Sequence, residues 1–281
     1  MLFRSVDGKM KGILYIVATP IGNLEDLSPR AQRVLSEVDL IVAEDTRHSR
    51  PLLNHFGIQT PMQSMHEHNE QDRVSALIER LHQGDSIAQI SDAGTPLIND
   101  PGYRLAAEAR AERITVSTVP GPSAPIVALT LSGLPVSRFC FEGFIPVKQQ
   151  ARQQYLEALA AETRTMIFFE SPRRVLDTLH SMMHCWGGQR RVSVARELTK
   201  LHESIYTAPL SELIPWIEAD ANRQRGEFVL VVEGAVEQQD DTEAYRMVKI
   251  LAKELPPRKA AALAAEITGV KKNQLYRSLM E

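Results

Sequence analysis

The chain lacks the features that mark an exported, disulfide-bonded or membrane-spanning protein. Its 281 residues include only two cysteines, Cys140 and Cys185, which provide neither a disulfide framework nor a zinc set. No apolar run approaches the ~20 residues needed to cross a bilayer, and the first residues show no apolar core followed by a cleavage pattern. These absences predict a cytoplasmic protein with no membrane segment and with both thiols buried.

Strong charge and aromatic richness are also missing. The formal net charge is −3 and aromatic residues make up 6% of the chain. A mildly acidic protein needs local basic patches to bind RNA, and few aromatics favour recognition of folded RNA over stacking on single strands. Neither G-x-G-x-x-G nor a Walker A sequence is present, so no dinucleotide or phosphate-cradling loop is indicated.

What the chain does contain is a repeated alternation of short apolar runs and amphipathic stretches. In the first half this pattern predicts a mostly parallel sheet covered on both faces. Ser28 is expected to cap one of the helices, with Pro29 in its first turn. The predicted strands are Gly12–Ala18, Asp39–Ala43, Ser86–Ile90 and Ile114–Thr118, and the predicted helices are Ser28–Glu37, Leu52–Gly57, Arg73–Gln83 and Tyr103–Ala111.

After Pro120-Gly-Pro122 the pattern predicts a second α/β domain of mixed strand direction. We therefore expect an N-terminal extension over residues 1–11, an α/β domain over 12–122 and a second over 123–238. The second domain is expected to have strands at Arg138–Phe144, Thr165–Phe169, Arg191–Ala195 and Glu227–Val232, and helices at Ala124–Ser132, Gln149–Glu162, Arg173–Met183 and Ser211–Ala219.

A polar linker, Gln238–Thr242, precedes a helical tail over residues 243–281. Its segment Pro257–Met280 has a helix–turn–helix pattern, with Gly269 at the turn and Val270 and Leu275 turned inward. The tail is basic, which fits either RNA contact or a small helical cap with solvated lysines. Between Ala244 and Glu281 the acids are Glu254, Glu266 and Glu281, and the basic residues outnumber them; they include Lys249, Lys253, Arg258, Lys259, Lys271, Lys272 and Arg277.

Four loops rich in Gly, Pro or polar residues follow predicted strands. In open α/β sheets, ligands bind beyond the carboxyl ends of the strands, so these loops outline a pocket whose backbone groups contact a small ligand. The loops are Ala18-Thr-Pro-Ile-Gly-Asn23, Ala43-Glu-Asp-Thr-Arg-His-Ser49, Ser91–Gly102 and Val119-Pro-Gly-Pro-Ser-Ala124.

These loops, together with three later motifs, resemble the tetrapyrrole methylase superfamily. The later motifs are Phe168-Phe-Glu-Ser-Pro172, Ala195-Arg-Glu-Leu-Thr-Lys200 and Gly226-Glu-Phe228. The match runs in order from about Gly12 to the tail and is most similar to a bacterial branch that methylates a cytidine 2′-hydroxyl of small-subunit (16S) ribosomal RNA. The pair Arg173–Arg174 departs from the histidine expected after Phe-Glu-Ser-Pro, which puts a substrate contact in question but not the reaction class.

The resemblance implies S-adenosyl-L-methionine bound between two α/β domains, ribosomal RNA, within the small ribosomal subunit, as the partner, and a homodimer. By position, the implied cofactor-binding residues are Pro20, Gly94, Thr95, Pro96, Ile98, Ser123, Ala124, Phe169, Ala195, Leu198, Gly226 and Glu227.

Transfer of a methyl group to a hydroxyl depends mainly on placement, with a further contribution from a general base. Candidate bases are Asp45, His66 and His68, and Arg47 and Lys200 are candidate electrostatic partners. Asp45 and Arg47 also fit a helix cap and its ion pair. His66 and His68 are spaced like a metal pair, but no third ligand is evident, so we expect no metal.

Basic side chains of the second domain are candidates for an RNA track, since the guanidinium fork suits phosphate. Among them are Lys148, Arg152, Arg164, Arg173, Arg174, Arg190, Arg191 and Arg196. Two other functions stay open at this point. One is methylation of a corrin or other tetrapyrrole precursor, which a basic tail does not favour. The other is a non-catalytic regulator that senses a small ligand and binds nucleic acid.

Overall fold

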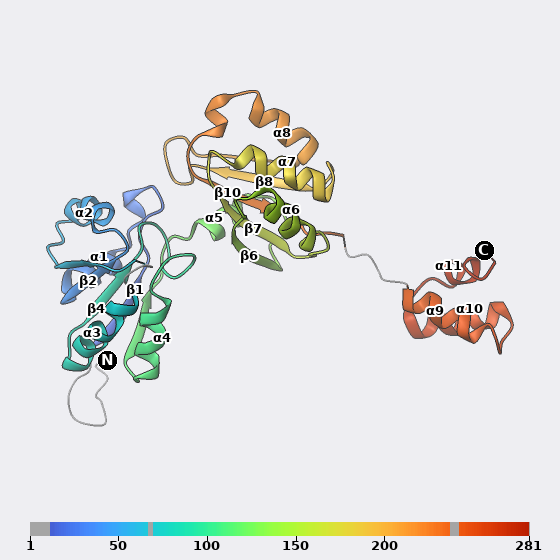
Figure 1. Cartoon of the computed structure of the whole chain (residues 1–281), viewed down its shortest axis with the longest axis horizontal. Helices are drawn as coiled ribbons and strands as arrows, with labels where there is room; N and C mark the ends of the chain where they lie inside the picture. Colours follow the sequence, from blue (N-terminus) through green and yellow to red (C-terminus); the bar gives the residue numbers. More distant parts are fainter. Residues whose placement is uncertain (1–11, 67–69, 237–241, 281) are drawn as a thin grey trace. The chain divides into compact units, whose positions relative to one another are not determined.

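The computed structural model describes residues 12–66, 70–236 and 242–280. The chain divides into two compact units, Met1–Ala235 and Val236–Glu281. The first unit contains two sheets and the second is helical (Figure 1). None of the helices in the described part of the chain is both long and apolar enough to span a bilayer.

The first sheet is parallel throughout and has the strand order β3-β2-β4-β1-β5. Its inner strands β2 and β4 are fully buried because helices cover both faces, and they consist almost wholly of apolar residues. The α/β fold class predicted from the alternation is confirmed. The strands are β1 Ile13–Val17, β2 Leu40–Ala43, β3 Met62–Ser64, β4 Ile87–Ile90 and β5 Thr115–Val119.

Two helix pairs form the cores on the two faces of this sheet. Val34, Leu35 and Leu53 pack on one face, whereas Leu81 and Leu105 pack on the other. Figure 1 shows α3 and α4 side by side, as their contacts require. The elements are η1 Leu24–Asp26, α1 Pro29–Glu37, α2 Thr46–His55, α3 Glu70–Gln83 and α4 Tyr103–Ala111.

The second sheet is mixed and has the order β6-β7-β10-β8-β9. Strands β6 and β7 are parallel, and the remaining pairs are antiparallel. The predicted mixed direction is confirmed. The strands are β6 Phe139–Phe144, β7 Thr165–Glu170, β8 Arg191–Arg196, β9 Ser204–Pro209 and β10 Phe228–Val232.

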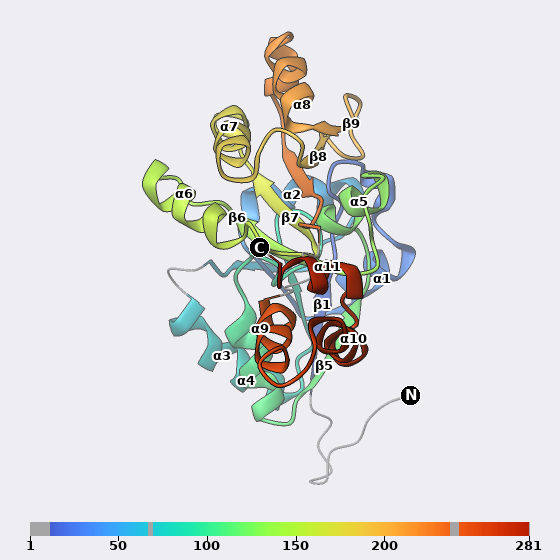
Figure 2. The ribbon, with the colours of Figure 1, turned by 90° about the vertical axis from the view of Figure 1, so that its right-hand side faces the viewer.

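Helices α6, α7 and α8 cover one face of the second sheet, where Leu156, Met182 and Leu213 are buried (Figure 2). Helix α5 covers the other face, and Ile21 from the loop after β1 packs into the same core as Leu129 of α5. The elements are α5 Ala124–Leu131, α6 Gln149–Ala158, α7 Val175–Trp186, α8 Leu210–Glu218 and η2 Ala221–Gln224.

Several local expectations need correction. Strands β3 and β9 were not predicted, because one has only three residues and the other alternates without a strong apolar run. Helix α2 begins at Thr46, not at Leu52, since the Asp45 carboxylate accepts the Arg47 N–H and caps it. Both cysteines are free thiols that are partly rather than fully buried.

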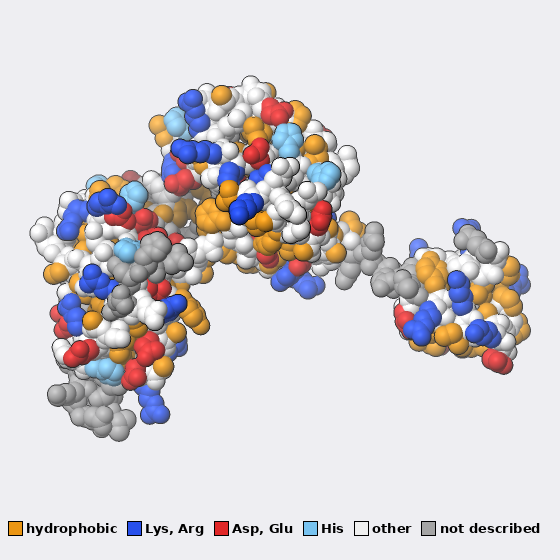
Figure 3. Space-filling model, viewed as in Figure 1, with side chains coloured by type: hydrophobic (Ala, Val, Ile, Leu, Met, Phe, Trp, Pro, Cys, Tyr) orange, Lys and Arg blue, Asp and Glu red, His pale blue; other side chains and the backbone are white. Residues whose placement is uncertain are grey.

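The second unit contains α9 Thr242–Leu251, α10 Pro257–Thr268 and α11 Lys272–Arg277. Gly269 ends α10 in the left-handed region, and Val270 and Leu275 are buried in the small core. The helix–turn–helix pattern therefore corresponds to α10 and α11. Figure 3 shows several Lys and Arg side chains on the visible face of this unit.

Candidate functional site

A cavity of about 260 Å³ lies at the ends of strands from both sheets. It is reached by the loops after β1, β4 and β5 of the first sheet and by the carboxyl ends of β6, β7 and β8 of the second. Such an edge is where open α/β sheets bind ligands. The lining residues are Ile21, Ala93, Gly94, Thr95, Ile98, Asp100, Ser123, Ala124, Pro125, Phe144, Phe169, Glu170, Leu198, Glu227, Phe228 and Val229.

The first wall of the cavity is built largely from backbone and is braced internally. The Gly94 N–H donates to the Thr19 carbonyl at 3.1 Å, and the Thr19 N–H donates to the Gly94 carbonyl at 2.9 Å. The Thr95 hydroxyl donates to the Pro122 carbonyl at 2.9 Å. Gly94 has φ +80°, and a Cβ there would lie 3.2 Å from Ile21 Cγ2. A side chain at this position is therefore both strained and crowded.

The N-terminus of α5 forms part of this wall and has no side-chain cap. Ser123 is the N-cap residue but makes no side-chain capping bond, and Ser123, Ala124 and Pro125 all line the cavity. The first N–H groups of a helix are unpaired within the helix, and the helix dipole favours a negative group beside them. This part of the cavity suits a carboxylate.

The second wall is apolar and aromatic. Phe144 ends β6, Phe169 lies near the end of β7, and Phe228 begins β10. The Phe169 ring contacts Phe141 edge-on at a centroid distance of 5.0 Å and Phe144 at 5.4 Å. Together with Leu198 these side chains form a surface suited to a flat aromatic ligand group.

A buried carboxylate holds the end of β7 in place. The Glu170 side chain is fully buried. It accepts hydrogen bonds from the Thr178 hydroxyl at 2.6 Å, the Ser171 N–H at 2.7 Å and Arg174 Nη2 at 3.0 Å. Because these three donors occupy both carboxylate oxygens, Glu170 holds the wall in place and does not serve as a free acceptor for a ligand.

The loop after β8 is joined to the start of β10 through Glu197. Its carboxylate accepts the Glu227 N–H at 2.9 Å and Lys200 Nζ at 3.0 Å. A Cβ on Gly226, which has φ +98°, would lie 2.6 Å from this carboxylate. Burial opposes the charge of Lys200, but hydrogen bonds with Glu227 and Glu197 outweigh it and raise the pKa of the ammonium. Lys200 is therefore a fixed cation.

Eight of the twelve residues predicted to bind the cofactor line the cavity: Gly94, Thr95, Ile98, Ser123, Ala124, Phe169, Leu198 and Glu227. The other predicted residues, Pro20, Pro96, Ala195 and Gly226, are adjacent in sequence to lining residues or sit behind them. The sequence did not predict the strand-end residues Phe144 and Val229 as binding residues, and Phe228 was part of a family motif without a predicted role. In the sequence, an apolar residue at a strand end cannot be told apart from one that is buried in the core.

The predicted catalytic residues are not all brought to the cavity. Asp45 caps α2 and pairs with Arg47 Nη2 at 2.7 Å. Hydrogen bonds from the Arg47 side chain and N–H hold the pKa of Asp45 far below its usual range. His66 lies beyond the end of edge strand β3 and does not line the cavity. His68 lies outside the described residues, and Lys200 reaches the rim through its 3.0 Å contact with Glu227.

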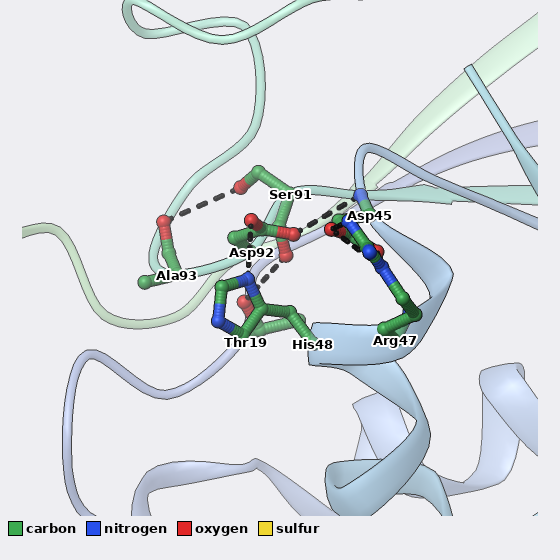
Figure 4. A network of polar contacts seen from close by, with 7 residues as sticks. All are labelled: Thr19, Asp45, Arg47, His48, Ser91, Asp92 and Ala93. Carbon is green, nitrogen blue, oxygen red and sulfur yellow. Dashed lines mark hydrogen bonds and ion pairs between the residues drawn. The ribbon is translucent and has the colours of Figure 1, made fainter. Parts of the chain in front are cut away.

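Figure 4 shows how Asp92 connects the loop after β4 to the start of α2. The Asp92 carboxylate accepts the Asp45 N–H at 3.2 Å and faces His48 Nδ1 at 3.1 Å. The preceding residue takes part as well, because the Ser91 carbonyl accepts a hydrogen bond from the Thr19 hydroxyl at 3.3 Å. The predicted loops after β1, β2 and β4 are thus tied to one another beside the cavity.

Asp100 is a titratable lining residue that was not predicted as a site residue. Its carboxyl is half-buried, and burial raises its pKa above the usual range. A hydrogen bond with Ser91 opposes this shift, and the charge of Asp92 adds to it. Burial and the charges of Asp100 and Asp92 likewise raise the pKa of Glu44. The acidic character of this corner arises from separate loops, which the sequence alone does not place together.

Metal binding finds no support in the described residues. Within residues 12–66, 70–236 and 242–280, no three His, Cys, Asp or Glu side chains are grouped so as to hold an ion.

Two family models together match most of the chain. Residues 13–214 match the model described as tetrapyrrole (corrin/porphyrin) methylases. Residues 238–281 match the model described as the RsmI C-terminal HTH domain.

Solved structures of low sequence identity share the fold. A diphthine synthase superposes with a TM-score of 0.60 at 15% identity, covering 82% of this chain and 93% of that one. A uroporphyrin-III-C-methyltransferase from Thermus thermophilus gives 0.56 at 18% identity, covering 79% and 94%.

Curated relatives match over nearly the whole chain. A protein of Escherichia coli O157:H7 named ribosomal RNA small subunit methyltransferase I is 52% identical over 96% of both chains. The protein of the same name in Pseudomonas aeruginosa is 52% identical, over 96% of this chain and 97% of its own. The chain therefore belongs to the tetrapyrrole methylase family and, within it, to the group of relatives that carry the name ribosomal RNA small subunit methyltransferase I.

Proposed function

We propose that the protein is an S-adenosylmethionine-dependent methyltransferase that modifies the ribose 2′-hydroxyl of a cytidine in 16S ribosomal RNA. The observation that carries the proposal is the cavity at the joined strand ends, in a chain half identical to relatives named for ribosomal RNA methylation. We also propose that residues 12–122 and 123–238 form two domains that together enclose the cavity, and that the protein acts in the cytoplasm.

The cavity has the groups that this cofactor requires. When bound, S-adenosylmethionine supplies an electrophilic methyl group on a positively charged sulfur. The aromatic wall around Phe169 suits the adenine, and the uncapped start of α5 suits the carboxylate. Gly94 leaves open the space that a side chain would fill. Backbone carbonyls and the Glu227 carboxylate suit the positive charges.

The residues of the chain then act mainly by positioning and by excluding water. Holding a hydroxyl in line with a methyl donor contributes as much as ~7–11 kcal/mol to lowering a barrier. We propose that Asp100 receives the hydroxyl proton, because it lines the cavity and its pKa lies above that of an ordinary aspartate. Asp45 is a weaker base than Asp100, since its charged form is held by Arg47.

The helical unit and an assembled dimer complete the proposal. The second unit has its own core and a basic surface, to which Arg246 also contributes. We propose that it binds the RNA of the small subunit by contacts to phosphates. The homodimer is proposed from the family resemblance and is testable by sedimentation of the full chain.

The decisive experiment is transfer of labelled methyl from S-adenosylmethionine to purified small ribosomal subunits. The expected product is RNA that resists alkaline cleavage at one cytidine, since a 2′-O-methyl group cannot attack the neighbouring phosphate. Label in a tetrapyrrole precursor instead would identify a small-molecule methylase. Tight cofactor binding with no acceptor of either kind would favour a ligand-sensing regulator.

A further inference from the structure

Arg152 stands out among the basic residues of the second sheet's helices because it is buried. It lies in the first half of α6 with only 7% of its surface exposed. Its Nε donates to the Ser181 hydroxyl on α7 at 3.0 Å. It forms no ion pair with a carboxylate in the part of the chain that the structure describes. A buried guanidinium without a counter-ion is costly, so such groups are normally paired.

The guanidinium lines a polar hollow of about 380 Å³ between α6 and α7. Its two Nη atoms have no hydrogen-bond partner in the described part of the chain and are accessible from the hollow. Gln149, Gln153 and His184 add groups that can donate to an anion. The Ser181 hydroxyl already donates to the Asp177 carbonyl at 2.7 Å, and His180 Nε2 lies 3.1 Å from the Glu218 carboxylate. Asp177 is the one carboxylate among the lining residues.

The position of the hollow relates it to the main cavity. Helices α6 and α7 run parallel, since Arg152 contacts Ser181 and the Trp186 indole N–H donates to the Leu156 carbonyl. Their first turns therefore follow the ends of β6 and β7, whose Phe144 and Phe169 line the cavity. The hollow lies in the helix layer that covers the face opposite α5, and the first turns of that layer begin at the sheet edge that carries the cavity.

We propose that the hollow around Arg152 binds a phosphate group of the RNA backbone while another nucleotide of the same RNA occupies the cavity. The inference rests on the proposed function and adds a substrate subsite to it. Arginine presents a planar fork that matches two phosphate oxygens. The exposed Lys148 and Arg173, just before α6 and α7, add positive charge at the same end. Asp177 disfavours the more highly charged free phosphate and so favours a diester, which carries a single charge.

The first test uses Arg152→Met, which keeps the aliphatic stem and removes the charge. Binding of small ribosomal subunits is expected to weaken by roughly tenfold. The slope of log affinity against log salt should fall by about 0.7 to 0.9 for the lost phosphate contact. Arg152→Lys should recover part of the affinity. Arg33→Met, an exposed arginine on α1 paired with Glu37, is the matched control and should change neither quantity.

A second measurement keeps the proposal testable if Arg152→Met folds poorly. Inorganic phosphate is titrated into the wild-type protein at constant ionic strength while the Arg152 Nε–H resonance is followed by NMR. A saturable shift that small subunits reverse supports the RNA subsite. No shift up to roughly 50 mM phosphate overturns it. A shift that subunits do not reverse assigns the hollow to free phosphate and also overturns the RNA subsite.

Methyl transfer is measured separately on the same proteins, so the two proposals fail in different ways. If the wild-type protein methylates no RNA yet loses RNA binding on Arg152→Met, the proposed function fails and the subsite stands. If it methylates RNA while Arg152→Met binds subunits as tightly as wild type with an unchanged salt slope, only the subsite fails. Equal cofactor affinity and melting temperature in both proteins exclude a folding defect as the cause.

Discussion

The two walls of the cavity are made in different ways. The wall from the first sheet consists of turns whose backbone is locked by reciprocal bonds between Thr19 and Gly94 and by the bond from Thr95 to Pro122. The wall from the second sheet consists of side chains at strand ends, such as Phe144 and Phe169, and is held from behind by the buried Glu170 carboxylate. Backbone shape governs the first wall and side-chain volume governs the second. Substitutions in the two walls should therefore fail in different ways.

The largest effect is expected where shape is decisive. Gly94→Trp should reduce S-adenosylmethionine affinity by roughly a hundredfold or more, because the side chain enters the cavity from a strained backbone. Isothermal calorimetry measures this directly. Gly57→Trp is the matched control, since Gly57 has a similar φ of +67° but no atoms within 4 Å of its Cβ. An unchanged affinity in Gly94→Trp would contradict the backbone role of this wall.

A large effect on rate, without loss of binding, is expected at Asp100. Asp100→Asn should slow single-turnover methylation by about 10²-fold or more if the carboxylate accepts the proton. The wild-type rate should rise with pH as Asp100 loses its proton. Because the pKa of Asp100 is raised, this rising limb of the pH–rate profile should lie at a higher pH than the pKa of 3.8 of an ordinary aspartate. The variant should lack the limb. Asp45→Asn should keep it, because the pKa of Asp45 is lowered and that group is already ionised.

Removal of residues 243–281 should weaken binding of small subunits by roughly tenfold and leave cofactor affinity intact. The reason is that every cavity residue precedes Leu230, whereas the helical unit has a core of its own. Parallel titrations with subunits and with S-adenosylmethionine check both statements. Equal subunit affinity with and without the tail would remove its proposed role.

A moderate effect is expected in the side-chain wall. Phe169→Ala should weaken cofactor binding by about tenfold, the amount expected for one aromatic contact and its buried area. Phe139→Ala, on the same sheet but 40% exposed and away from the cavity, is the control. If Phe169→Ala binds normally while Gly94→Trp does not, the second wall contributes enclosure and little affinity.

The contrast between the walls also explains what the sequence predicts. Turn chemistry at Gly94, Thr95 and Ser123 indicates a ligand-facing loop, because Gly and Pro fix a rigid turn that leaves backbone groups open to a ligand. Phe228 and Val229 carry no such signal, since an apolar strand end looks like core until the sheets are assembled. Asp45 was predicted as a candidate base or as a helix cap; the structure shows the cap, and a role as a base stays a prediction. Asp100 was overlooked because its neighbours Pro101 and Gly102 mark it as a turn.

The placement of Ile21 has a consequence for how the first unit unfolds. This residue leaves the loop after β1 and packs among Leu129, Leu134 and Ile167 of the second sheet's core. Neither sheet can melt alone without exposing part of a hydrophobic cluster that both share. Heating should therefore give one cooperative transition for the two sheets, and a ligand that bridges the walls should raise that single midpoint rather than split it.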